Sequence, residues 1–374
     1  MDHELLFRSK RILLIYDRNE LGDYLHKVLP LLFLIKCKNP KASIDILNLK
    51  EPKPCVTLIS EKMNLTRSID RLDGPYDFIY VYDCSKYLFP VTPLKQMLRH
   101  WLNIHVPEAL LHIERTPGRG LYITQKKIFF LNYLQDSLLD YIPYYNQYYR
   151  QAFLAYFRKI FYDGQSPRVN DITINIGSFN KNKGANNNRL FQDRIAEVIR
   201  SNPEKGFNLI GYSDELVSPS LKALLNEPRV CNFLDKIDKT HGMLTLINLL
   251  FQSKYVIVRN TGILHLAGLC NSHIITLSAS NDIRRSLYLR RDIRIVNRFT
   301  PESAHVLYHE KWMPFADNII SIHEYKKGNP FYNRTIGSKI SQVLNGQLPE
   351  DGRGLGLLGL CLLGLCLVYW GTRS

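Results

Sequence analysis

The chain has 374 residues, of which 45% are hydrophobic and 22% are charged, and this balance excludes an intrinsically disordered protein. Its length is enough for two domains with separate cores. With 49 Lys and Arg against 34 Asp and Glu, the net charge is +15, which favours an anionic partner such as a phosphorylated ligand or an acidic membrane surface. The sequence has neither zinc-finger spacing nor basic runs interleaved with aromatic residues, so nucleic acid is the least favoured partner and none is expected.

The first predicted strand, residues 11–16, is followed directly by Asp17. This apolar run is too short for a signal peptide, so we expect a cytoplasmic protein. The seven cysteines agree with a reducing compartment, because they are scattered, odd in number and form no C-x-x-C pair. That pattern also argues against a disulfide framework and against a thiolate zinc site.

Short apolar runs alternate with helical patterns along the chain. The predicted strands are residues 11–16, 43–47, 77–83, 172–177, 207–211, 255–258, 273–277, 293–297 and 318–322. Unbroken apolar strands separated by helices are typical of parallel sheets covered on both faces. We therefore predict an α/β fold with two Rossmann-like domains, whose ligand sites lie beyond the carboxyl ends of the strands.

The alternation is interrupted at residues 162–171, where Gly164 and Pro167 separate a helical region from a new strand. This interruption predicts an N-terminal domain at 1–165 and a C-terminal domain at 166–348. We expect the last helix of the second domain to pack back on the N-terminal domain.

The helix before this boundary carries aromatic residues at helical spacing, with Arg150, Arg158 and Lys159 elsewhere on its surface. Two interpretations stay open at this point. The helix packs on the first sheet, or it presents a basic and aromatic surface to a membrane or a glycolipid acceptor.

The C-terminal tail, residues 349–374, differs in composition from the rest of the chain. Residues 355–371 are uncharged and rich in Gly, Leu and Cys. A transmembrane span needs about 20 apolar residues, so this stretch is marginal. A short membrane anchor, a non-native terminus and a segment packed on the protein are all open interpretations.

Two polar turns, each leading from a predicted strand into a predicted helix, are the candidate binding sites. In the second turn, Thr261 can cap the helix, Gly262 allows a ligand close to the backbone, and His265 can bind a phosphate or a sugar hydroxyl. In the first turn, Gly22 permits a tight turn and Asp23 begins a helix. Asp23 is either a favourable charge at a helix N-terminus or a base that takes a proton from an acceptor hydroxyl.

Taken together, the two turns resemble glycosyltransferase family 9, the heptosyltransferases that build the inner core of lipopolysaccharide. Residues 11–47 are similar to the family's opening strand, Gly-Asp loop, helix with His and Pro, and Pro-x-Ala-x-Ile-Asp element. Residues 233–277 contain a version of its Asp-[Ser/Thr]-Gly-x-x-His-x-Ala signature, and residues 174–199 and 208–215 match less sharply. The resemblance runs from about residue 10 to 345 and leaves out the tail.

The resemblance implies a GT-B fold, in which two Rossmann-like domains face each other across a cleft. The acceptor binds the N-terminal domain and the nucleotide-sugar binds the C-terminal domain. Transfer inverts the anomeric centre and requires neither a metal nor another cofactor. The sequence agrees with this, since no Asp-x-Asp element leads out of a strand and no cluster of metal ligands is present.

The family's functional residues carry over to nine positions of this chain. Asp23 matches the catalytic base, with Gly22 beside it, and Thr261, Gly262 and His265 match contacts to the donor phosphates and sugar. The remaining matches are the phosphate-binding lysine at Lys181 or Lys183, an acidic residue near the nucleotide at Glu215, and Asn260, which replaces the aspartate of the family signature.

We therefore hypothesise an inverting, metal-independent glycosyltransferase that moves heptose from ADP-heptose to a lipopolysaccharide core or a related acceptor. Its expected partners are a nucleotide-sugar donor, a lipid-linked or oligosaccharide acceptor and the acidic inner-membrane surface, with the enzyme peripheral on the cytoplasmic face of that membrane. Two alternatives stay open. In the first, the protein is a non-catalytic sugar-nucleotide-binding homologue, because Asn260 removes a negative charge beside the donor. In the second, it is a basic nucleic-acid-binding protein, which the net charge of +15 would allow.

Overall fold

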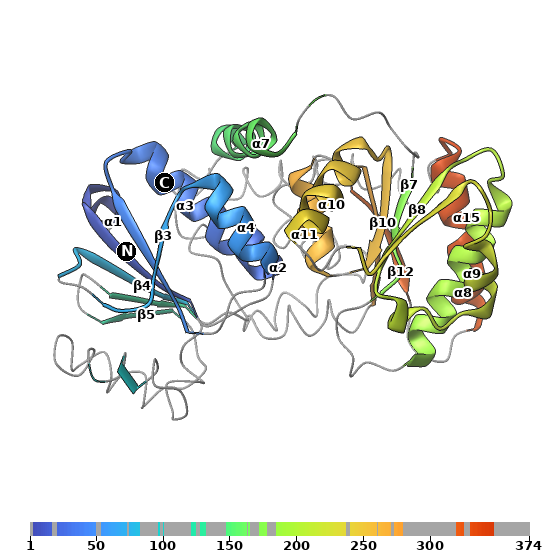
Figure 1. Cartoon of the computed structure of the whole chain (residues 1–374), viewed down its shortest axis with the longest axis horizontal. Coiled ribbons are helices and arrows are strands. Elements are labelled where there is room, and N and C mark those ends of the chain that lie inside the picture. Colours follow the sequence, from blue (N-terminus) through green and yellow to red (C-terminus); the bar gives the residue numbers. More distant parts are fainter. Residues whose placement is uncertain are drawn as a thin grey trace, which may run out of the picture.

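In the computed structural model of the chain, two six-stranded sheets flanked by helices form two domains (Figure 1). The structure describes residues 3–16, 21–49, 54–72, 75–82, 96–97, 100, 121–124, 128–131, 147–162, 164, 172–177, 185–236, 240–259, 261–270, 273–279, 319–324 and 330–347. The first sheet contains β1–β6 and the second contains β7–β12. The change of sheet thus falls between β6 and β7, the interval that contains the predicted boundary at 165/166.

The N-terminal sheet has the order β3-β2-β1-β4-β6-β5, and its strands are parallel except β5, which pairs antiparallel with β6. Its strands are β1 (Arg11–Tyr16), β2 (Ser43–Asn48), β3 (Arg67–Ile69), β4 (Phe78–Tyr82), β5 (Leu121–Thr124) and β6 (Ile128–Leu131). The described helices of this domain are α1 (His3–Arg8), α2 (Leu21–Asp23), the π-helical η1 (Tyr24–Val28), α3 (Leu29–Lys38) and α4 (Pro54–Met63).

The C-terminal sheet is parallel throughout and has the order β12-β11-β10-β7-β8-β9. Its strands are β7 (Ile172–Asn175), β8 (Phe207–Gly211), β9 (Val230–Leu234), β10 (Tyr255–Arg259), β11 (His273–Ala279) and β12 (Ile319–Glu324). Its helices are α8 (Ala185–Ser201), the 3₁₀-helical η4 (Ser213–Glu215), α9 (Pro219–Leu224), α10 (Thr240–Gln252), α11 (Gly262–Leu269) and α15 (Pro330–Leu344). This is the Rossmann order, and the chain changes direction across the sheet between β7 and β10, where ligands bind in such folds.

The predicted fold class, an α/β fold of the GT-B type with two Rossmann-like domains, is confirmed. Eight predicted strands are present, while the one expected at 293–297 lies outside the described residues. Four of the described strands were not predicted from the sequence: β3, β5, β6 and β9. Of these, β3 and β9 lie at sheet edges and expose residues along the strand, so neither forms the unbroken apolar run of a central strand.

The helix α7 (Gln147–Phe161) packs on helices of both domains. The ring centroid of Phe153 lies 5.3 Å from that of Phe33 on α3, and the ring of Phe157 lies 6.3 Å from that of Phe251 on α10. Phe153, Phe157 and Phe161 are all buried. The aromatic face of α7 is therefore packed inside the protein. This corrects both interpretations of the helix: the aromatic face packs on other helices rather than on the first sheet, and it is not available to a membrane.

The expectation that the last helix packs back on the N-terminal domain is wrong. α15 packs on α8 of its own domain, and the Asn202 side chain at the end of α8 donates a hydrogen bond to Ser341 Oγ at 3.1 Å. The apolar residues of α15 recur at i, i+4, i+7 and i+8, so they form one face, which is buried in the C-terminal core. These residues are Ile336, Ile340, Val343 and Leu344.

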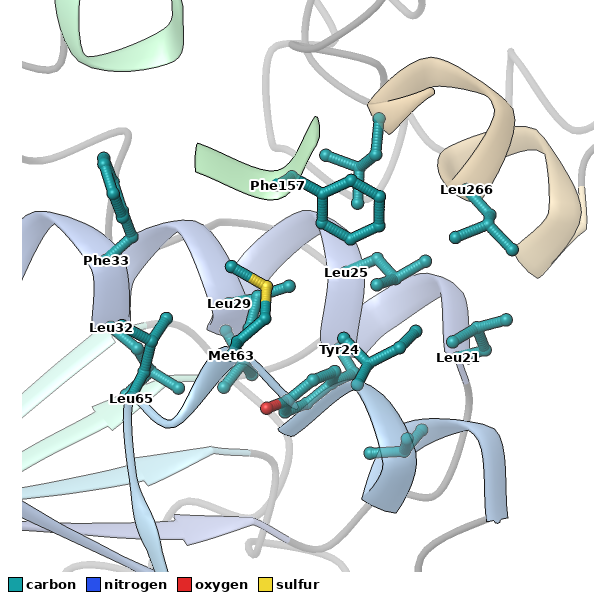
Figure 2. Packing of buried hydrophobic residues seen from close by; sticks show 14 of the residues in the cluster. Leu21, Tyr24, Leu25, Leu29, Leu32, Phe33, Met63, Leu65, Phe157 and Leu266 are labelled. Atoms are coloured by element: carbon teal, nitrogen blue, oxygen red, sulfur yellow. The ribbon is translucent and has the colours of Figure 1, made fainter. Parts of the chain in front are cut away.

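A continuous apolar core joins the two domains. It extends from the helices around α3 through α7 to α10 and α11, while a second core lies beneath α8, α9 and α15. Figure 2 shows Leu21 and Leu25 of the N-terminal domain on the side of their helix that faces Leu266 of α11 and Phe157 of α7. An apolar contact of this kind opposes free movement of one domain against the other.

No helix in the described ranges is long and apolar enough to cross a membrane. The tail at 349–374 lies outside these ranges, so its three interpretations stay open. Cys37, Cys55, Cys231 and Cys270, the cysteines for which the structure gives a state, are free thiols.

Candidate active site

The two turns singled out in the sequence touch each other across the domain boundary. A methyl group built on Gly22 would lie 2.9 Å from Cδ2 of His265 and 3.4 Å from Cα of Gly262. A methyl group on Gly262 would lie 3.2 Å from both the backbone nitrogen of Gly22 and Cβ of Leu21. The structure thus brings Gly22, Gly262 and His265 together, and at this level the domains are in contact rather than separated by a cleft.

Each turn follows a central strand of its sheet. The first follows β1, which lies between β2 and β4, and the second follows β10, which lies between β11 and β7. Both are therefore at the carboxyl edge of a parallel sheet, beside the point where the strand order changes direction. Gly262 was expected to let a ligand approach its backbone; the close approach at its Cα is made instead by Gly22 and Leu21.

Thr261 is the N-cap residue of α11. The prediction that its side chain caps the helix is wrong. Its backbone is extended, with φ −141° and ψ 172°, and its carbonyl accepts a hydrogen bond from the Leu264 N–H at 3.0 Å. Its Oγ1 accepts a hydrogen bond from Nδ2 of Asn175 at 3.2 Å instead. Because the Thr261 side chain does not cap the first turn of α11, the N–H groups of that turn are suitable donors for a phosphate.

Asn175, the last residue of β7, is a positioning residue that the sequence analysis missed. Its side chain is 1% exposed, and its Oδ1 accepts a hydrogen bond from the Gly177 N–H at 3.2 Å while its Nδ2 binds Thr261. One amide thus links the turn after β7 to the turn after β10. A signal was present, since Asn175 is a polar residue inside an apolar strand.

Gln192 is a second buried amide that organises this edge of the sheet. It lies on α8 with no exposed surface, and its Nε2 donates to the carbonyl oxygens of Ile176 (3.1 Å) and Glu215 (2.7 Å). Its Oε1 accepts the N–H groups of Val217 (2.9 Å) and Ser218 (3.0 Å). These four bonds hold η4 and the segment after it against the end of β7.

Glu215 lies at the carboxyl end of β7, as its proposed role near the nucleotide requires. Its carboxylate rests on Gly177 so closely that a methyl group there would overlap with it. The loop that follows Gly177 contains Lys181 and Lys183, and both lie outside the described residues. Their contact with a donor phosphate stays a prediction.

Arg259 brings a positive charge to the carboxyl end of β10. Its Nη1 donates to Oδ1 of Asn188 at 3.1 Å, and its guanidinium carbon lies 5.5 Å from the ring centroid of Phe191. Both partners are on α8, so the guanidinium is fixed between β10 and the helix that follows β7. No role of its own was predicted for Arg259 from the sequence. Asn260, the next residue, lies outside the described residues.

Asp23 is the last residue of α2, directly after the glycine that touches His265. The structure describes its backbone and not its side chain, so its role as a base stays a prediction. The helix then widens into the π-helical η1, because Pro30 in the following turn has no N–H to donate to a carbonyl one turn earlier. Short π-helical segments are frequent at functional sites.

Tyr24, the residue after Asp23, anchors this widened segment. Its side chain is fully buried, its hydroxyl forms a 2.6 Å hydrogen bond with Oγ of Ser60, and its ring packs edge-on against Tyr16 at the end of β1. Burial raises the pKa of Tyr24 to about 12, although the hydrogen bond with Ser60 lowers it. Tyr24 therefore stays neutral and fixes the backbone next to Asp23.

Asp45, the aspartate of the Pro-x-Ala-x-Ile-Asp element, belongs to the fold rather than to the site. Its carboxylate is 1% exposed and accepts two hydrogen bonds from the Arg67 guanidinium (2.9 and 3.0 Å) and one from Tyr76 (3.1 Å). Burial raises the pKa of this carboxyl, but these hydrogen bonds and the charges of Arg67 and Arg11 outweigh it, so the pKa is lowered. Arg11 and Arg67 begin β1 and β3, at the end of the sheet opposite to the turns.

Within the described residues, no group of three or more His, Cys, Asp or Glu side chains is close enough to hold a metal ion. The proposed positive charges at this site are instead Arg259, the N-terminus of α11 and the two lysines of the loop. Metal independence stays a prediction.

No family model matches the chain, and no curated protein matches it. Among solved structures, Escherichia coli ADP-heptose lipopolysaccharide heptosyltransferase II has 13% sequence identity and a TM-score of 0.49, over 90% of this chain and 98% of that one. E. coli heptosyltransferase WaaC with ADP-2-deoxy-2-fluoro heptose has 15% identity and a TM-score of 0.49, over 90% and 99%. A glycosyltransferase of family 9 from Veillonella parvula has 12% identity and a TM-score of 0.43, over 92% and 91%. At these identities and scores, the function has to be argued from the residues of this chain.

Proposed function

We propose that the protein is an inverting glycosyltransferase that transfers a sugar, heptose from ADP-heptose, to a lipopolysaccharide core or a related acceptor. The observation that carries this proposal is the contact between α2 and α11, because it unites two turns with complementary chemistry. One ends in a carboxylate residue, Asp23, and the other offers an uncapped helix N-terminus next to His265. These are the parts that an acceptor hydroxyl and a nucleotide diphosphate require.

The donor binds at the turn after β10 in this proposal. The uncapped N-terminus of α11 provides N–H groups and the positive end of a helix dipole for the diphosphate. Arg259 adds a fixed positive charge at the same strand end, and the loop after Gly177 adds Lys181 and Lys183. As the diphosphate leaves, its growing negative charge is stabilised by these groups, so the reaction needs no metal.

The acceptor binds on the side of α2. Asp23 accepts the proton of the acceptor hydroxyl while the oxygen forms a bond to the anomeric carbon of the donor sugar. The bond between that carbon and the phosphate oxygen breaks on the opposite face, which inverts the anomeric centre. In this proposal, His265, which is on the first turn of α11 and against Gly22, forms a hydrogen bond to the sugar or the phosphate.

Asn260 supports a second candidate function, a sugar-nucleotide-binding protein without transfer activity. An asparagine there keeps the shape of the family's aspartate and removes its negative charge. For the enzyme, we propose a peripheral location on the acidic cytoplasmic face of the bacterial inner membrane, supported by the net charge of +15. A lipid-linked acceptor would be reached there.

A panel of nucleotide-sugars, with ADP-heptose, ADP and UDP-sugars tested separately, checks the donor site by thermal shift. A donor at about 100 times its dissociation constant should stabilise the fold by about 2.7 kcal/mol. Arg259→Gln should weaken binding by about 10-fold or more, because a charged hydrogen bond to phosphate is lost. Arg200→Gln, at the other end of α8, is the matched control and should bind like the wild type.

Two outcomes would contradict or refine the proposal. If no member of the panel raises the melting temperature, the donor site is wrong. If ADP-heptose binds but a soluble acceptor oligosaccharide gains no sugar by mass spectrometry, the non-catalytic alternative holds.

A further inference from the structure

Two glycines of opposite domains are packed face to face in the site. Gly22 precedes the candidate base directly, and Gly262 begins the helix of the candidate donor turn. The ring of His265 lies against Gly22 on one side, and the side chain of Leu21 lies against Gly262 on the other. We propose that Gly22, Gly262 and His265 form a packed joint that sets the position of Asp23 relative to the donor turn.

The distances show that the joint leaves little room for a side chain. Carbon atoms in ordinary contact are about 3.5–4.0 Å apart, so a methyl group at 2.9 Å from Cδ2 of His265 requires the imidazole ring or the two turns to shift by roughly 0.5–1 Å. On Gly262 the nearest atoms are the backbone nitrogen of Gly22 and Cβ of Leu21, both at 3.2 Å, and they move only with their helix. The close approach of the other domain thus favours glycine at both positions.

Both turns of the joint are held firmly by their own domains. A displacement at Gly22 would therefore move the whole turn, including Asp23, rather than be taken up by local rearrangement. On the N-terminal side, Tyr24 is fully buried and hydrogen-bonded to Ser60. On the C-terminal side, Thr261 is held by the buried Asn175. Between these anchors, Leu266 and its neighbours form a closed apolar packing (Figure 2). Gly22 is therefore a positioning residue, and a methyl group on it would displace Asp23 with the turn.

The part of this inference that concerns the reaction rests on the proposed function, whereas the joint itself can be tested without it. The test is a cycle of Gly22→Ala, His265→Ala and the double variant. Gly22→Ala should lower the melting temperature by about 2–4 °C, as expected for an overpacked contact. In the His265→Ala background, Gly22→Ala should lower the melting temperature by less than half as much, because the ring that the methyl group meets is gone.

Gly22→Ala should also lower kcat for transfer by about 10- to 100-fold, the effect of moving a reacting group by about 1 Å. Its dissociation constant for the nucleotide-sugar should change by less than about threefold, since the donor turn keeps its contact with Asn175. Gly337→Ala is the matched control. Its methyl group would meet the end of the flexible Glu197 side chain at 3.2 Å, far from the site, so kcat should not change.

Each remaining outcome decides one part of the inference. Equal melting shifts in both backgrounds overturn the contact with His265, and an unchanged kcat in a destabilised Gly22→Ala variant overturns the positioning role. If Gly22→Ala alone does not fold, recovery of folded protein in the double variant supports the joint, and failure to recover it overturns the joint. A wild-type protein that binds no nucleotide-sugar refutes the proposed function, while the melting cycle still decides the joint.

Discussion

The turn after β1 and the turn after β10 meet in one site, yet different interactions hold them. Beside the C-terminal turn, two buried amides, Asn175 and Gln192, fix the backbone through hydrogen bonds. Beside the N-terminal turn, the buried side chains of Leu21, Tyr24 and Leu25 fix it by packing (Figure 2). A hydrogen-bonded network sets the direction of backbone groups, whereas packing sets volume. In the proposed enzyme, the hydrogen-bonded arrangement suits the turn whose N–H groups bind the diphosphate, and the packed arrangement suits the turn that positions the carboxylate of Asp23.

The largest effect should come from the carboxylate itself. Asp23→Asn should lower kcat by about 10²- to 10⁴-fold, because asparagine cannot accept the proton of the acceptor hydroxyl. Donor affinity, measured by thermal shift, should stay near that of the wild type, since the donor turn belongs to the other domain. Asp70→Asn, an exposed aspartate at the end of β3, is the control and should transfer normally. Near-normal transfer by Asp23→Asn would leave Asp23 as a helix-terminal charge only.

A second test compares the two sides directly. Gln192→Leu removes four hydrogen bonds from buried backbone groups, so the free energy of unfolding should fall by about 3 kcal/mol or more. Leu25→Ala on the other side should cost about 2–5 kcal/mol through the cavity it leaves. Urea titrations measure both losses. Although the two variants should lose similar free energies of unfolding, only Gln192→Leu should weaken donor binding in the folded protein. It removes the hydrogen bonds that hold the segment carrying Glu215.

Loss of donor binding in both variants would mean that the two sides are not independent. The apolar core shared by the domains would then transmit the change from one turn to the other.

How far the sequence predicts this site depends on the distance between its parts. The central strands, such as β1 and β10, were predictable because burial on both faces leaves unbroken apolar runs, and both turns were predictable from their glycines. The contact between Gly22 and His265 was not, because local patterns carry no information on which surfaces of two domains meet. The same limit explains α15: its apolar spacing predicts one buried face and leaves open whether α8 or the other domain covers it.

The buried polar residues form an intermediate case. Asn175 interrupts an apolar strand and Gln192 lies on the buried side of α8, so both could be noticed in the sequence. Their partners are backbone groups of distant segments, which the sequence does not reveal. Thr261 illustrates this: its type and position predicted a helix cap, but the presence of Asn175 gave its side chain another partner.

The polar cluster of the N-terminal domain lies at the far end of its sheet, away from the turn. Asp45→Asn should lower the free energy of unfolding by about 1–3 kcal/mol by weakening the bonds from Arg67 and Tyr76, without changing donor affinity. The folded-state pKa of Asp45 is lowered, so its contribution is fully present above the unfolded value of about 4 and is lost as the pH falls through the folded value. The melting temperatures of the wild type and the variant should therefore converge as the pH falls below about 4. A difference that stays constant as the pH falls would show that the charge of Asp45 does not contribute.

The smallest effect should come from the anchor beside the candidate base. Tyr24→Phe keeps the packed ring and removes the hydroxyl, so at neutral pH the free energy of unfolding should fall by about 0.5–1.5 kcal/mol, the worth of one hydrogen bond. The folded-state pKa of Tyr24, about 12, lies above the unfolded value of about 10. The contribution of the hydroxyl is therefore fully present below pH 10 and is lost as the pH rises towards 12, because the unfolded chain ionises first. Urea titrations at pH 8 and near pH 10.5 should show the gap between the two proteins narrowing at the higher pH. A gap that stays the same would mean that Tyr24 ionises as easily in the folded protein as in the unfolded chain, and its hydroxyl could not then be the dry anchor that holds the backbone of Asp23.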